Sequence, residues 1–119
     1  MARIVLIEDD DLNRRLIAYL LRKIDGTEVV DFADGKKALE YLRNSEVQLI
    51  VLDYQLPHIT GREMIEVIRS ISHLAAIPVV VLTAYLMQRE NFLSMGFTDY
   101  IPKPIENEKF VEGIKKYIV

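Results

Sequence analysis

The chain has 119 residues, of which 50% are hydrophobic and 28% charged, and its formal net charge is -3 at pH 7. These values are typical of one globular domain, and the interleaved charges form no basic stripe for direct binding to nucleic acid. Zero cysteines exclude a disulfide framework and a thiolate metal site. We expect a soluble, cytoplasmic protein without membrane attachment, because the sequence shows no secretory signal and no apolar run approaches the roughly 20 residues of a membrane span.

Five short apolar segments have the pattern of strands buried on both faces of a parallel sheet. They are Ile4–Ile7, Glu28–Phe32, Val47–Leu52, Pro78–Leu82 and Tyr100–Ile101. Pro102 removes a backbone donor from the last segment. We therefore expect that strand at an edge of the sheet.

Segments of helical periodicity alternate with the expected strands. Their apolar positions run over Leu12–Ile24, Ala38–Leu42, Met64–Ile71, about Leu86–Met95 and Phe110–Ile118, and the fourth is the least regular. We expect Asp34 to cap the second helix and Gly26 and Gly96 to end the first and the fourth. Tyr19, Tyr41 and Tyr117 fall on helical faces, where packing at the edge of the core is expected.

The alternation of five strands with five helices predicts right-handed crossovers and a three-layer α/β sandwich. We expect residues 1–119 to form one domain with a doubly wound, flavodoxin-like (βα)5 fold and strand order 2-1-3-4-5. In such a sheet, ligands bind beyond the carboxyl ends of the strands, near the point where the strand order reverses. The residues that follow each apolar run are therefore the candidates for a functional site.

Acidic, hydroxyl and amine side chains follow four of the expected strands. They are Glu8, Asp9, Asp53, Thr83 and Lys103. Neighbouring carboxylates repel unless a cation lies between them, and an oxygen-only cluster suits Mg²⁺, with Mn²⁺ as the alternative. We expect Asp9 and Asp53 to be side-chain ligands and Glu8 to hold a metal-bound water. A carboxylate beside Mg²⁺ can accept a phosphoryl group, and Lys103 and Thr83 fit the binding of its oxygens.

Four short motifs, in order along the whole chain, resemble those of bacterial response-regulator receiver domains. They are Glu8-Asp9 after a Val-Leu-Ile strand, Asp53-Tyr54-Gln55-Leu56-Pro57 with Gly61, Thr83-Ala84, and Lys103-Pro104. Each motif is short, but the set and its order are specific. Within the family, the chain is similar to single-domain regulators of the chemotaxis type.

The resemblance implies a function in two-component phosphorelay signalling. A histidine kinase or a histidine phosphotransfer protein would transfer a phosphoryl group from phosphohistidine to Asp53. The domain would be a phosphoacceptor that assists its own phosphorylation and dephosphorylation, and not an enzyme. The resemblance also implies that the backbone carbonyl of Gln55 completes the metal site and that Tyr100 is an aromatic switch. The switch would act, together with Thr83, on a surface of the fourth helix, fifth strand and fifth helix, where a downstream protein binds.

Other functions on a similar sheet require features that this sequence lacks. A small aspartyl phosphatase generally has a second acid two residues after the nucleophile, where Gln55 stands. A nucleotide-binding or flavodoxin-like carrier needs a glycine-rich loop after the first strand, where acids stand instead. A receiver-like scaffold that binds partners without phosphorylation is disfavoured by the complete set of acceptor-site residues.

One apolar group has two interpretations. Ile101, Pro104 and Ile105 form either the plain end of the last strand or, together with Leu12 and Leu16, a docking patch. The sequence does not decide between the two.

Overall fold

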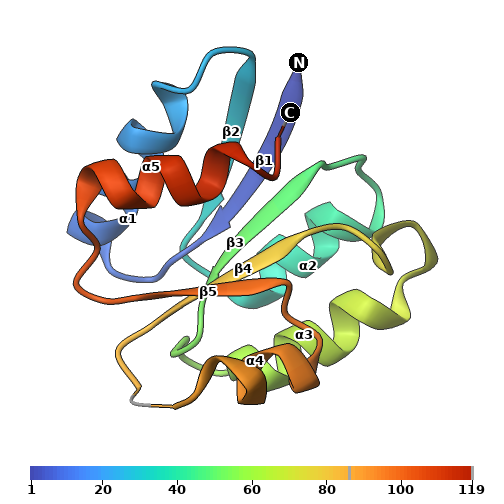
Figure 1. Ribbon diagram of the computed structural model, residues 1–119. Helices are drawn as coiled ribbons and strands as arrows, with labels where there is room; N and C mark the ends of the chain where they lie inside the picture. Colours follow the sequence, from blue (N-terminus) through green and yellow to red (C-terminus); the bar gives the residue numbers. More distant parts are fainter. Residues whose placement is uncertain (86, 119) are drawn as a thin grey trace.

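A five-stranded parallel sheet forms the centre of the computed structural model, which describes residues 1–85 and 87–118 (Figure 1). The strands are β1 (Ala2–Ile7), β2 (Thr27–Phe32), β3 (Leu49–Asp53), β4 (Val79–Thr83) and β5 (Asp99–Pro102). Their order, β2-β1-β3-β4-β5, confirms the predicted doubly wound topology. β5 pairs only with β4 and lies at the edge, as the missing donor of Pro102 requires.

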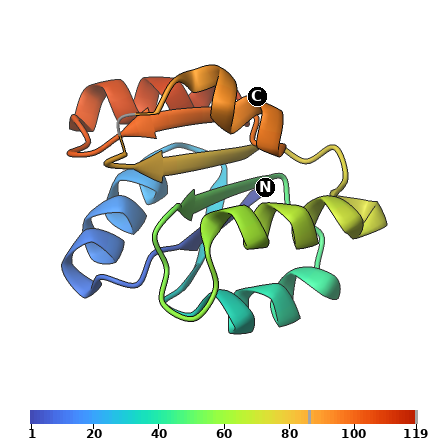
Figure 2. The same cartoon turned by 90° about the horizontal axis from the view of Figure 1, so that it is seen from below.

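In the described residues, four α-helices connect successive strands and a fifth follows β5, and together they cover both faces of the sheet. They are α1 (Asp11–Arg22), α2 (Gly35–Arg43), α3 (Gly61–Ser70), α4 (Arg89–Met95) and α5 (Asn107–Lys115), and a short 3₁₀ turn, η1 (Ser72–Leu74), follows α3. Figures 1 and 2 show α1 and α5 on one side of the sheet and α2, α3 and α4 on the other. None of the helices in residues 1–85 and 87–118 is long and apolar enough to cross a membrane.

The alternation of side chains along the central strands divides the core into two layers. In β1, Ile4 and Leu6 pack against residues of α1 and α5, whereas Val5 and Ile7 pack against residues of α2, α3 and α4. All four side chains are fully buried. The continuous apolar runs of the sequence therefore reflect burial on both faces.

The helix ends follow the expected capping chemistry in part. The Asp34 side chain accepts hydrogen bonds from the first turn of α2, and Gly96 ends α4 in a left-handed conformation, with φ of 119°. Gly26 was wrongly expected to end the first helix. α1 already ends at Arg22 with Lys23 as its C-cap, and Gly26, with φ of 79°, forms the turn before β2.

Two expectations for the helices differ from the structure. The fourth helix was expected from Leu86, a residue outside those described, and α4 begins at Arg89. Tyr19 was expected at the edge of the core, but it is 57% exposed because the buried face of α1 is formed by Ile17, Ala18, Leu20 and Leu21. Tyr41 and Tyr117 do pack against the core as expected.

The loop after β3 is closed by a contact that only glycine permits. Gly61 donates its N–H to the Tyr54 carbonyl at 2.9 Å. A Cβ atom at Gly61 would lie 2.6 Å from the Tyr54 ring and 2.7 Å from the Tyr54 carbonyl oxygen. These distances are too short for any side chain unless the loop moves, and that loop leads directly from Asp53 into α3.

Alanine substitutions at two glycines should therefore have opposite effects on stability. Gly61→Ala should lower the free energy of unfolding by about 1–3 kcal/mol, because the added methyl group overpacks the loop. Gly113→Ala, in the middle of α5, should raise it by about 0.5–1 kcal/mol, since a Cβ there meets Ile101 at an ordinary distance of 3.7 Å. Urea unfolding measures both changes. Equal free energies of unfolding in the two variants would contradict the packing described for Gly61.

Candidate functional site

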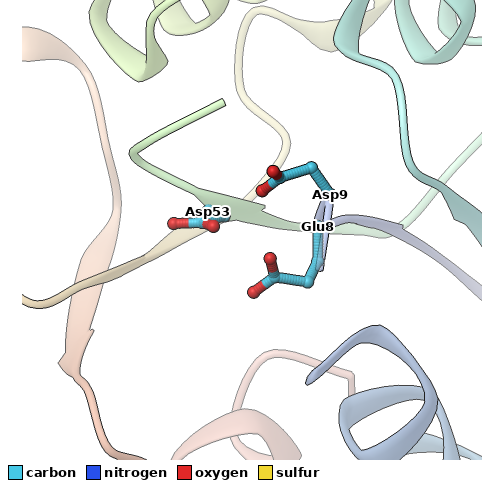
Figure 3. A group of neighbouring side chains, drawn as sticks. All are labelled: Glu8, Asp9 and Asp53. Atoms are coloured by element: carbon cyan, nitrogen blue, oxygen red, sulfur yellow. The ribbon is translucent and has the colours of Figure 1, made fainter. Parts of the chain in front are cut away.

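Three carboxyl groups meet where β1 and β3 end. Asp53 is the last residue of β3, and Glu8 and Asp9 directly follow β1, its neighbour in the sheet. Each of the three acids offers one oxygen, and these oxygens lie within 4.8 Å of one another. Figure 3 shows that the three side chains project to the same side of the strand ends.

The three acids differ in exposure and in their hydrogen bonds. Glu8 and Asp53 are 0% and 4% exposed, whereas Asp9 is exposed. One oxygen of Glu8 contacts Lys103, and the other accepts the N–H of Asp10 at 3.1 Å. Within residues 1–85 and 87–118, no hydrogen bond uses the Asp9 carboxylate. Asp9 is thus the acid that is both free and open to solvent.

Lys103 brings a positive charge to the two buried acids. Its Nζ lies 3.0 Å from Glu8 Oε1 and 3.1 Å from Asp53 Oδ2. The backbone N–H of Lys103 donates to the Thr83 carbonyl at 2.8 Å. This backbone bond continues the β4–β5 ladder past Pro102 and so fixes the point from which the long side chain crosses to the acids.

Burial and charge shift the ionisation of this group. Burial raises the pKa of the Glu8 carboxyl above its ordinary value, although the hydrogen bonds from Lys103 and Asp10 act in the opposite direction. Burial alone would lower the pKa of Lys103, but its contacts with Glu8 and Asp53 outweigh burial and raise it. Lys103 therefore remains a cation at neutral pH. Two of the three carboxyl groups share this one ammonium group and Asp9 lies beside them, so a second cation that binds oxygen would relieve the repulsion among the three acids.

The donor set fits Mg²⁺ by its chemistry. It consists only of oxygen atoms, and Mg²⁺ favours one or two carboxylates together with retained waters. Both oxygens of Glu8 and Oδ2 of Asp53 already contact protein donors, whereas the Asp9 carboxylate accepts no hydrogen bond within the described residues. Gln55 lies in the loop after β3, and its N–H donates to Asp53 Oδ1 at 3.2 Å. The expected role of its carbonyl as a ligand stays a prediction.

Thr83 and Tyr100 lie on the side of the site toward β5. Thr83 is the last residue of β4, is 1% exposed, and its Oγ1 accepts the N–H of Tyr85 at 2.9 Å. Tyr100 is half-buried in β5 and stacks on Phe92 of α4, with ring centroids 5.4 Å apart. The expected switch residue therefore contacts α4 through an aromatic stack.

Other aromatic side chains next to the site were not predicted from the sequence. Tyr54, the residue directly after Asp53, packs edge-on against Phe92 at 5.3 Å and against Tyr85 at 5.5 Å. The rings of Tyr54, Phe92 and Tyr100 thus form a continuous contact from the end of β3 to β5. The aromatic residues were visible in the sequence, but their contacts join segments far apart along the chain.

The apolar residues for which the sequence left a strand end and a docking patch open lie in two different places in the structure. Ile101 packs toward the core of the α1 and α5 face. Leu16, Pro104 and Ile105 instead line a groove of about 400 Å³ that reaches Lys103, which we call the α1 groove. Leu12 and Leu16, on the same helix, are 78% and 40% exposed. These exposed side chains favour the docking patch over the plain strand end.

Asp99 connects the three elements of the expected partner surface. Its carboxylate accepts a hydrogen bond from the Tyr117 hydroxyl at 2.6 Å and pairs with Arg89 at 3.2 Å. Arg89 is the first residue of α4, Asp99 the first of β5, and Tyr117 follows α5. Burial alone would raise the pKa of Asp99, but the bonds from Tyr117, the Tyr100 amide and Arg89 outweigh it, and the pKa is lowered. In turn, burial and the contact with Asp99 raise the pKa of Tyr117 to about 12.

Comparisons with known proteins agree on one family. The family model described as the response regulator receiver domain matches residues 4–115. The chain is 33% identical over 117 residues to the polar-differentiation response regulator DivK of Brucella anthropi, a match that covers 97% of this chain and 94% of that protein.

Solved structures agree with the sequence comparison. The receiver domain of the sensor histidine kinase PA1611 from Pseudomonas aeruginosa is 30% identical, with a TM-score of 0.87 and coverage of 98% of this chain and 97% of that one. That crystal structure holds a magnesium ion in its active site cleft. The chemotaxis response regulator CheY4 of Vibrio cholerae, 24% identical over 98% of each chain, has a TM-score of 0.90 and shares the fold.

Asp99→Asn should destabilise the chain in a pH-dependent way. At pH 7 the variant should lose about 1–3 kcal/mol of unfolding free energy, because hydrogen bonds to a charged group are lost or weakened. The pKa of Asp99 is lowered by folding, so the ionised form stabilises the fold above the unfolded pKa of about 4 and this contribution is lost as pH falls through the lower folded value. Urea unfolding at several pH values should therefore show the difference from wild type shrink in acid.

The control is Glu66→Gln, which removes an exposed carboxylate that pairs with Arg62 at 3.9 Å. This variant should differ from wild type by less than about 0.5 kcal/mol. A loss in Asp99→Asn that stays constant from pH 7 into strong acid would contradict the role given to the ionised carboxylate.

Proposed function

The chain belongs to the response regulator receiver domain family, and on this basis we propose that it takes a phosphoryl group on Asp53 during two-component phosphorelay signalling. The observation that carries the proposal is the setting of Asp53. Among the three clustered acids, it alone ends a central strand, and it contacts the Lys103 ammonium group while lying beside Asp9 and Glu8. Gln55, two residues later, offers no acid for the chemistry of an aspartyl phosphatase.

Asp9 and Asp53 are the residues we assign as Mg²⁺ ligands. Glu8, the most deeply buried of the three acids, would act through a metal-bound water. The Gln55 carbonyl would complete the set. The magnesium ion in the PA1611 receiver domain supports this assignment, and Mn²⁺ has similar oxygen preferences. When bound, the ion supplies positive charge that offsets the charge of the entering phosphoryl oxygens.

The proposed chemical step is a transfer between two residues. A carboxylate oxygen of Asp53 attacks the phosphorus of a phosphohistidine, the new O–P bond forms and the N–P bond to the donor histidine breaks. Lys103 already lies 3.1 Å from Asp53, so its ammonium group can bind a phosphoryl oxygen without a large movement. The Thr83 hydroxyl accepts from Tyr85 and keeps its own proton free to donate to another oxygen. Later attack by water on the phosphorus would release inorganic phosphate and restore the Asp53 carboxylate. The domain would thus be a phosphoacceptor that assists its own phosphorylation and dephosphorylation.

The phosphohistidine donor must approach close to Lys103 and Asp53. A histidine kinase or a histidine phosphotransfer protein would present it, and we infer that the donor docks on the α1 groove. That groove is lined by Leu16, Pro104 and Ile105 and ends at Lys103. Leu12, 78% exposed in the first turn of α1, would extend the apolar contact.

The output would leave the site through Thr83 and Tyr100. A phosphoryl oxygen on Asp53 would draw the Thr83 hydroxyl toward it and away from the Tyr85 N–H that it now binds. Tyr100 would then turn inward and alter its stack on Phe92 of α4. The surface formed by α4, β5 and α5 changes as a result, and a downstream protein binds it differently.

Asp53→Asn tests the acceptor assignment. Incubation of wild type with acetyl phosphate and Mg²⁺ should add the mass of one phosphoryl group, measured on the intact chain, and Asp53→Asn should add none. The control Asp25→Asn, an exposed acid in the turn before β2, should be labelled like wild type. Full labelling of Asp53→Asn would refute the assignment.

Thr83→Ala tests the path to the partner surface. Beryllofluoride with Mg²⁺, a stable mimic of the phosphoryl group, should shift the amide NMR signals around Asp53 in both proteins. It should shift those of Phe92 and Tyr100 in wild type only, because the variant lacks the hydroxyl that follows the phosphoryl oxygen. The lost coupling should amount to about 1–3 kcal/mol.

Thr83→Ser is the matched control for that experiment. It keeps the hydroxyl group and should keep the distant shifts. If Thr83→Ala shows the same shifts at Phe92 and Tyr100 as wild type, Thr83 does not transmit the signal.

A further inference from the structure

The carbonyl of Glu8 lies where the β1–β2 ladder ends. The N–H of Glu8 still donates to the Phe32 carbonyl at 3.0 Å, and Phe32 is the last residue of β2. The Glu8 carbonyl, just beyond the end of β1, accepts from a side chain instead of a strand. Arg14 Nη1 of α1 donates to this oxygen at 3.2 Å.

The other guanidinium nitrogens of Arg14 are held by two acids. Nη2 lies 2.6 Å from Asp11 in the first turn of α1, and Nε lies 3.2 Å from Asp31 in β2. The side chain is only 17% exposed, and its three contacts join the end of β1, the start of α1 and β2. A planar guanidinium with three engaged nitrogens has little freedom to rotate.

Arg14 donates to the peptide group that joins Glu8 to Asp9, two of the three clustered acids. The Glu8 carbonyl and the Asp9 amide belong to the same planar unit, so fixing the oxygen also fixes the direction in which Asp9 leaves the strand. Asp9 is exposed, and its carboxylate takes part in none of the hydrogen bonds found in the described parts of the chain. Its orientation toward Asp53 therefore depends on the backbone.

We infer that Arg14 is a positioning residue for the metal site, which holds the Glu8–Asp9 peptide so that the Asp9 carboxylate faces Asp53. The inference rests on the proposed Mg²⁺ site and adds to it a residue that does not touch the ion. Groups that orient metal ligands in this way typically change metal affinity by about 10–100-fold when they are removed.

Electrostatics and positioning predict opposite signs for the loss of Arg14. Removal of a positive charge near a cation site should, by Coulomb's law alone, strengthen Mg²⁺ binding. Loss of a peptide clamp should weaken it. The sign of the change in affinity therefore separates the two effects.

The test is a Mg²⁺ titration of the full chain, followed by the amide NMR signals of residues 8–10 and 53. Arg14→Gln should raise the Kd for Mg²⁺ by about tenfold or more and should shift the Asp9 and Asp10 signals even before metal is added. Arg14→Lys, which keeps the charge but cannot hold three partners as a fork, should also weaken binding.

Two control variants have matched chemistry. Arg22→Gln removes the other basic partner of Asp31, 3.6 Å away, without touching the Glu8 carbonyl. Arg15→Gln removes an exposed charge from the next position of α1. Both should bind Mg²⁺ as well as wild type or slightly better. Arg14→Lys serves where Arg14→Gln folds poorly, because it keeps the positive charge and a loss of Mg²⁺ affinity in it can only come from the lost positioning.

The outcomes distinguish the inference from its premise. If wild type, Arg14→Gln and Arg22→Gln all bind Mg²⁺ with the same affinity, Arg14 has no positioning role, while the proposed metal site stays intact. Tighter binding in Arg14→Gln would show that only its charge matters and would also overturn it. If the wild-type chain binds no Mg²⁺, the proposed metal site fails, and the role of Arg14 fails with it.

Discussion

The shared contact of one ammonium group with two buried carboxylates is the constraint on which the site depends. Glu8 and Asp53 are almost fully buried, and Lys103 lies within 3.1 Å of both. Buried charges are costly unless they are paired, and here two acids share one partner. The arrangement is maintained by a two-layered core that fixes the ends of β1, β3 and β4. The rigid core therefore carries two buried acids with only one positive charge between them, which favours the binding of a further cation.

The residues around the site fall into two groups that act in different directions. Arg14 of α1, which pairs with Asp31 of β2, donates to the carbonyl of the peptide that joins Glu8 to Asp9. Tyr54, Phe92 and Tyr100 connect the end of β3 to α4 and β5. The first group faces the proposed metal site, and the second faces the surface that Asp99 ties together. The proposed metal site and the proposed output surface thus lie on opposite sides of Asp53.

Sequence patterns predicted the strands, their order and the set of polar residues at the strand ends, because burial and strand-end position leave local signals. The apolar run of β1 and the edge position implied by Pro102 are examples. Local signals failed where the outcome depends on distant partners. Periodicity did not show that Leu12, Leu16 and Tyr19 of α1 stay exposed, since the buried face of this helix is formed by other residues. The pair of Arg14 with Asp31 and the contacts of Asp99 join segments that are separated in sequence and could not be read from spacing.

The position of Lys103 at the end of the edge strand has a consequence for local unfolding. β5 has four residues and one neighbouring strand, so it belongs to the part of a sheet that opens most readily. When its end detaches, the ammonium group leaves and two buried carboxylates face each other alone. The acids therefore resist fraying of a strand to which neither belongs. The rate of amide hydrogen exchange in β5 should therefore report on the negative charge of Glu8 and Asp53 at the centre of the sheet.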